Sequence, residues 1–127
     1  MSYPFQPQQG LIVVKVEVAG VHGNAVLRLA LDTGATNTLI NVALLVAIGY
    51  DPALAPDVVQ VTTGSGVEFV PRIVVTKLSA LGLDQAGFAV LCRTLPTSAN
   101  VDGLLGLDFF RGRVLSLDFQ KGIIELQ

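Results

Sequence analysis

The sequence predicts a small protein that is mostly β, a barrel of short strands with one or two short helices. Short runs rich in valine alternate with glycine-containing turns along its 127 residues, a pattern typical of small barrels. Hydrophobic residues make up 51% of the chain and charged residues 14%, so the chain has enough apolar surface to bury a core. We expect residues 1–10, rich in Pro and Gln, to be a flexible polar leader, and residues 11–127 to be the single domain.

The first strands are predicted from alternation of polar and apolar residues. Residues 11–19 alternate, and residues 25–31 return after a turn, which predicts a hairpin. The second strand runs directly into residues 32–36, a polar break that contains glycine. Residues 42–48 are predicted to form a short helix, because an asparagine that can cap it precedes them and a glycine that can end it follows.

A second hairpin follows from two β-rich runs, residues 58–62 and 67–75. Between them, Thr63, Gly64, Ser65 and Gly66 make a good hairpin tip, since glycine readily takes positive φ. Pro71 indicates that the second strand is at an edge or irregular at that point, because proline has no N–H to donate. Residues 88–93 form a further strand, reached through a loop around Gly82 and Asp84.

The last quarter of the chain predicts one more helix and two strands. Residues 107–111 form a short helix that Asp102 would cap and that carries Asp108. Residues 114–119 and 123–126 then form the closing strands around a turn.

Composition excludes several functional classes. A net charge of -2 without a basic block argues against nucleic-acid partners. One cysteine, Cys92, and one histidine, His22, cannot form an internal disulfide or a tetrahedral zinc cluster; we expect Cys92 in the core and His22 in solvent. No run approaches the roughly 20 apolar residues of a membrane helix, and the N-terminus has no apolar signal region, so we expect no membrane partner and a cytoplasmic location.

The most informative feature is Asp32, which directly follows an apolar strand and begins the sequence Asp-Thr-Gly. A carboxylate at the end of a buried strand needs hydrogen-bond donors, and the Thr33 hydroxyl and the N–H groups of a tight turn can supply them. A motif of three residues is only suggestive by itself. A hairpin precedes it, a glycine-tipped hairpin follows about 30 residues later, and Leu104-Leu105-Gly106 enters the last predicted helix.

Together these segments resemble the retropepsin-like aspartic proteases, the single-domain relatives of pepsin, and most closely their bacterial group. There, a segment similar to residues 31–36 is followed much later by one similar to residues 102–109. The resemblance covers residues 11–126 and implies a closed acid-protease barrel with one lobe per chain. It also implies an aspartic endopeptidase that acts on peptides or proteins, needs neither cofactor nor metal, and is active as a homodimer.

The chemistry independently requires two carboxylates, one to activate water as general base and one to protonate the carbonyl oxygen. The chain has one Asp-Thr-Gly, so a two-fold axis beside Asp32 would supply the second. Because the pair must share one proton, the pH profile should be bell-shaped.

The resemblance also assigns supporting roles. Thr33 would brace the pair across the axis, and Gly34 would let the substrate backbone approach closely. Ala35 replaces the serine of many pepsin-like enzymes; losing that donor predicts a less acid optimum. Residues 62–67 would form a flap over an extended peptide, with substrate contacts from Thr63, Gly64, Ser65 and Gly66.

Other interpretations remain open. Asp32 could be a turn aspartate bonded to its own backbone. The chain could be a non-catalytic retropepsin-like module that dimerises or binds peptides, or a small barrel that holds a small ligand. A metal site or single-chain pair built from Asp32, Asp102 and Asp108 is disfavoured, because the last two belong to the predicted helix and its cap.

Two further expectations concern surfaces. Residues 123–126 alternate like an apolar edge strand and would lie in the dimer interface, so truncation after Lys121 should abolish dimer and activity together. The substrate pockets should be apolar, lined by Leu39, Val67, Phe69 and Leu105.

Overall fold

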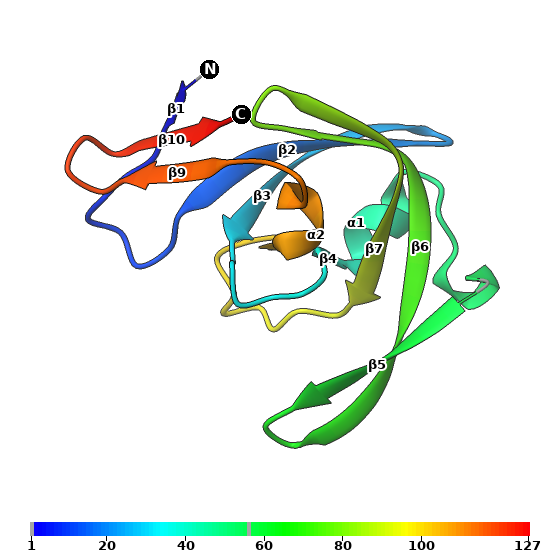
Figure 1. Ribbon diagram of the computed structural model, residues 1–127. Helices are drawn as coiled ribbons and strands as arrows, with labels where there is room; N and C mark the ends of the chain where they lie inside the picture. The colour runs from blue at the N-terminus through cyan, green and yellow to red at the C-terminus, as the bar shows by residue number, and fades with distance from the viewer. Residues whose placement is uncertain (1, 56) are drawn as a thin grey trace.

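One additional strand pairing closes the larger sheet into a barrel. The computed structural model describes residues 2–55 and 57–127, with the backbone alone at Thr63. The sheet has the order β2-β3-β8-β4-β7-β6-β5, and β2 also pairs with β6, so six strands form a closed ring with β5 outside it (Figure 1). This confirms the predicted barrel. The strands are β2 (Val13–Gly20), β3 (Gly23–Leu31), β4 (Leu39–Asn41), β5 (Asp57–Thr63), β6 (Gly66–Ala80), β7 (Leu83–Arg93) and β8 (Gly103–Leu105).

The first hairpin has the predicted alternation. β2 and β3 pair antiparallel from Val13↔Ala30 to Gly20↔Gly23. Val14, Val16 and Val18 are buried, while the residues between them face solvent. One face of the hairpin therefore belongs to the core, as period-two patterning requires.

The hairpin of β6 and β7 is longer than predicted. The two strands pair over most of their length and turn at Leu81 and Gly82, which have φ of 52° and 75°. The expected loop around Gly82 is this tight turn alone. The period-two pattern of β6 is interrupted: Ile73 and Val75 are buried, residues 76 and 77 are both exposed, and the next buried positions are Leu78 and Ala80. Pro71 pairs with β5, and the ladder to β7 begins at the next residue, Arg72, as expected for a residue without an N–H.

Two short α-helices and a 3-10 turn, Pro52–Leu54, accompany the strands. The Asn41 side chain caps α1 (Val42–Ala47) by accepting the Ala43 N–H at 3.2 Å, and Gly49, with φ of 106°, follows the helix end, as predicted. α2 (Leu107–Phe110) begins after Gly106 without a side-chain cap. Asp102 therefore does not cap it: the Asp102 carboxylate accepts the Arg28 backbone N–H at 2.8 Å.

A smaller sheet contains β1 (Ser2–Pro4), β10 (Ile123–Leu126) and β9 (Leu115–Asp118), in that order. The expected polar leader thus contains a strand, and Phe5 after it is buried in the core. The expectation of an apolar edge strand at residues 123–126 is wrong, because β10 lies between β1 and β9 and both of its edges are paired. That 11–127 form one domain remains a prediction.

The core fills the ring and extends under the small sheet. Phe109 lies near its centre and makes edge-to-face contacts with Phe88 and Phe110. Cys92 is buried, as predicted, and burial raises the pKa of its thiol to about 11. His22 is exposed at a hairpin turn, also as predicted. Within the described residues, no helix is long and apolar enough to cross a membrane.

Candidate active site

Asp32 stands where β3 leaves the sheet, at the start of the loop formed by residues 32–38. Its backbone N–H donates to the Leu105 carbonyl at 2.9 Å, and its carbonyl accepts from Ala35 at 3.2 Å. The Gly34 N–H donates to Asp32 Oδ1 at 2.9 Å. The side chain is half-buried, so its position is fixed while one side still reaches solvent. An ordinary turn aspartate makes the same bond to Gly34, so the surroundings must decide what this residue does.

The segment 105–108 holds this loop from behind. Leu107 N–H donates to the Ala35 carbonyl at 2.8 Å, and Asp108 N–H donates to the Thr36 carbonyl at 3.3 Å. Gly106 is buried beneath the loop; a Cβ there would lie 2.7 Å from the Asn37 carbonyl carbon and 2.8 Å from the Ala35 oxygen. A glycine is therefore required for the loop to pack so closely on the start of α2.

Buried Thr38 and half-buried Asp108 together fix the far end of the loop. The Thr38 backbone N–H donates to both carboxylate oxygens of Asp108, at 3.0 and 2.9 Å, and the Thr38 hydroxyl donates to Oδ1 at 2.7 Å. The same hydroxyl accepts the Gly106 N–H at 3.1 Å. Asp108 lies on α2 as predicted, but the sequence did not reveal that it holds the loop bearing Asp32.

A cleft of about 380 Å³ opens between this loop and the hairpin of β5 and β6. Gly34 and Ala35 line it from the loop, and Thr62 lines it from β5, so the structure brings those three predicted residues together. Thr33 is exposed at the turn. Gly64, Ser65 and Gly66 are exposed at the hairpin tip, outside the cleft lining, and the Thr63 side chain lies outside the described part of the chain.

The apolar lining differs from expectation in part. Leu39 lines the cleft as predicted, but Leu105 is fully buried in the core. Val67 and Phe69 are exposed and do not line the cleft. Among the described residues of the hairpin, those that line the cleft all come from β5, and none comes from β6. The apolar lining that sequence reasoning missed comes from Val61, Leu91 and Leu104.

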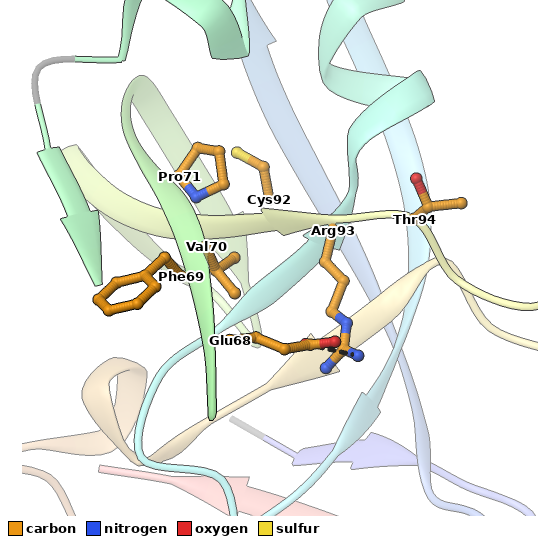
Figure 2. Close-up of a pocket in the computed structure, with 7 residues that line it drawn as sticks. All are labelled: Glu68, Phe69, Val70, Pro71, Cys92, Arg93 and Thr94. Atoms are coloured by element: carbon orange, nitrogen blue, oxygen red, sulfur yellow. Dashed lines mark ion pairs between the residues drawn. The ribbon is translucent and has the colours of Figure 1, made fainter. Parts of the chain in front are cut away.

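The same reasoning missed Arg93, which lines the cleft at the end of β7. Its guanidinium forms an ion pair with Glu68 on β6, with 2.8 Å between Nη2 and Oε2 (Figure 2). A signal was present in the sequence: Arg93 is a charged residue that ends an otherwise apolar predicted strand.

Fold and loop together define an acid-protease lobe, and comparisons with known proteins agree. The model of the aspartyl protease family matches residues 14–109, so the chain belongs to this family. A retropepsin-like aspartic protease from Rickettsia conorii has a similar crystal structure, with a TM-score of 0.73 and 16% identity, covering 99% of this chain and 88% of that chain. That likeness confirms the retropepsin-like fold. Among curated protein sequences, none matches this chain.

Proposed function

We propose that the chain is an aspartic endopeptidase whose active site forms from two copies of Asp32 across the axis of a homodimer. The observation that carries this proposal is the position of Asp32. Its half-buried carboxylate is fixed by Gly34, in a loop that lines an open cleft of about 380 Å³. A turn aspartate that only stabilised its own loop would need no such cleft beside it.

The proposed reaction uses the two carboxylates with one proton between them. The ionised Asp32 takes a proton from a water, which attacks the peptide carbonyl, while its protonated counterpart donates to the carbonyl oxygen. Asp32 is not itself among the residues that line the cleft, although Gly34 and Ala35 of its loop are, and the described lining holds no other Asp or Glu. A second chain related by a two-fold axis is the simplest source of the other carboxylate. Thr33 is proposed to brace this pair.

The hairpin of β5 and β6 is proposed as the flap. It extends away from the ring of strands (Figure 1), and Gln60, Val61 and Thr62 of β5 line the cleft. An extended peptide in the cleft would lie between this hairpin and Gly34 and Ala35. Residues 62–67, with Thr63, Gly64, Ser65 and Gly66 at the tip, would close over it and exclude water.

Two expectations about pH belong to the same proposal. The pH profile should be bell-shaped, because activity requires the singly protonated pair. The optimum should be less acid than that of pepsin-like enzymes with a serine at the position of Ala35.

The cytoplasmic location also stays a prediction, which fractionation of the source cells tests.

The decisive experiment compares the wild-type chain with Asp32→Asn on a diverse peptide pool between about pH 4 and 7, the range spanned by shifted carboxylate pairs. We expect the substitution to lower cleavage at least about a hundredfold, the usual size of a general acid–base contribution. Asp84→Asn is the matched control, since Asp84 is exposed on β7 outside the cleft lining.

Three outcomes separate the interpretations. Fragments that depend on Asp32 but not on Asp84 support the endopeptidase. Identical fragments from wild type and Asp32→Asn would contradict it. Binding of peptides by both proteins without any cleavage would favour the non-catalytic module with the same fold.

A further inference from the structure

The ion pair between Glu68 and Arg93 spans a gap between two strands. β6 and β7 pair as far as Arg72↔Leu91, and beyond this point β6 continues with β5 alone. A hollow of about 470 Å³ opens where they separate, and both side chains line it. Figure 2 shows their charged ends meeting across this hollow, while Phe69 lies on the other side of β6.

Arg93 also belongs to the cleft. It lines the cleft together with Gly34 and Ala35 of the loop that bears Asp32. Among the described residues that line the cleft, Arg93 is the charged one; its neighbours there are apolar or neutral polar residues. A peptide lying in the cleft would therefore meet one positive charge beside an apolar surface from Leu39 and Leu91.

The pair with Glu68 leaves this charge available. The side chain of Arg93 is 36% exposed and that of Glu68 is 45% exposed, and ion pairs with this much solvent contact are held weakly. The recorded contact uses Nη2 of a guanidinium with five N–H donors in a planar fork. A second carboxylate can therefore share the guanidinium or replace Glu68 without leaving a buried charge unpaired.

We propose that Arg93 determines specificity, by selecting peptides that carry a Glu or Asp side chain at the subsite beside Leu39 and Leu91. Glu68 is its internal competitor: it occupies the guanidinium when the cleft is empty and yields it to the carboxylate of the substrate. The bound peptide then excludes water from the guanidinium, which strengthens the new ion pair. This inference rests on the proposed function, because it assigns a substrate class to that site.

The test uses a positional-scanning decapeptide library in which each position in turn is fixed as Glu or as Gln. For the wild-type chain, we expect kcat/KM to favour Glu over Gln about fivefold at one position, the effect of a partly screened ion pair. Arg93→Gln should bring this ratio close to one, and Arg93→Lys should restore part of it. Glu68→Gln should increase the ratio, because the competitor loses its charge.

Arg72→Gln is the matched control. Arg72 also forms an ion pair on the hairpin, with Asp57, but does not line the cleft. We expect it to leave the Glu-to-Gln ratio unchanged. A wild-type enzyme that cleaves the library with equal kcat/KM for Glu and Gln at every position would overturn the inference, as would an Arg93→Gln variant that keeps the preference.

Binding separates failure of this inference from failure of the proposed function. Fluorescence anisotropy measures how tightly the same peptides bind to two proteins. One carries Asp32→Asn, and the other carries both Asp32→Asn and Arg93→Gln. If the wild-type chain cleaves nothing while Glu peptides bind more tightly than Gln peptides only when Arg93 is present, the endopeptidase is overturned and the specificity is supported. If the wild-type chain cleaves nothing and peptide binding does not depend on charge, both the endopeptidase and the specificity are overturned.

Discussion

Thr38 shows how one buried residue can hold the loop that bears Asp32. It is fully buried, yet its backbone N–H and hydroxyl both donate to Asp108, and the hydroxyl also accepts from Gly106. Hydrogen bonds to a charged acceptor are stronger than neutral ones. The loop from Asp32 to Thr38 is therefore held at both ends, by Leu105 at the first and by Asp108 at the last.

Replacing Thr38 by Val tests this role. The side chain keeps its shape, but the Asp108 carboxylate loses one donor and the buried Gly106 N–H loses its side-chain acceptor. We therefore expect the free energy of unfolding to fall by about 1–3 kcal/mol. Chemical denaturation measures the change. Thr36→Val is the control, because Thr36 is exposed on the same loop. Equal losses of stability in Thr38→Val and Thr36→Val would contradict a stabilising role of the buried hydrogen bonds.

The Cys92 thiol makes stability depend on pH in the alkaline range. Burial raises its pKa in the folded protein from 9.0 to about 11, against a smaller opposing effect of a backbone hydrogen bond with Ile73. The unfolded chain thus releases this proton first as pH rises. The stabilising effect is complete below about pH 9 and is lost between about pH 9 and 11, with a total on the order of 3 kcal/mol.

Urea denaturation at pH 8 and pH 10.5 measures this loss. Tyr and Lys residues also titrate in this range, so the informative quantity is the difference between wild type and Cys92→Ala. We expect the variant to be less stable than wild type at pH 8 and to lose less stability on going to pH 10.5. Parallel pH dependence in the two proteins would contradict the assignment to Cys92.

Among the secondary-structure elements, those stabilised by local sequence were predictable and those defined by distant partners were not. The hairpin of β2 and β3 and the Asn41 cap follow from patterns within a few residues. β4 and β8 have three residues each, too few for any periodicity, and β8 pairs with β3 and β4 across the chain. Gly103 in β8 explains the close packing: a Cβ there would lie 2.0 Å from the Leu39 carbonyl oxygen.

Strand β10 has a different role from the one its sequence indicated. Ile124 is 1% exposed and packs in the core, and the strand is paired on both sides. Truncation after Lys121 would remove this central strand, so we now expect it to unfold the chain rather than only separate a dimer.

Ile124→Ala tests the role of β10 without removing the strand. We expect it to cost about 2–4 kcal/mol, as for other large core residues. Glu125→Ala is the control; because Glu125 is exposed on the same strand, its effect should stay within about 0.5 kcal/mol. If Ile124→Ala keeps its thermal stability but changes the oligomeric state, β10 would belong to the dimer interface as first expected.

At the scale of the whole molecule, the turn that bears Asp32 was easier to predict from the sequence than the walls of the neighbouring cleft. The turn at Asp32 and Gly34 was predictable because its hydrogen bond lies within three consecutive residues. The cleft wall draws on β5, β7 and β8, and whether a residue faces it depends on strand register, which reverses with a shift of one residue. Leu39 lines the cleft as expected, whereas Phe69 lies on β6, a strand from which no described residue lines it.

The proposed active site needs two chains, and mixing experiments can count them. Wild type and Asp32→Asn are mixed in varying proportion at constant total concentration, after unfolding and refolding together so that chains pair at random. If each site takes one Asp32 from each of two chains, only wild-type homodimers are active, so an equal mixture should retain about one quarter of the wild-type activity. If one chain suffices, it should retain about half. Linear dependence on the wild-type fraction would therefore overturn the shared pair, even if Asp32→Asn alone proved inactive. Mixing wild type with Asp84→Asn corrects for losses on refolding, because both partners then carry Asp32.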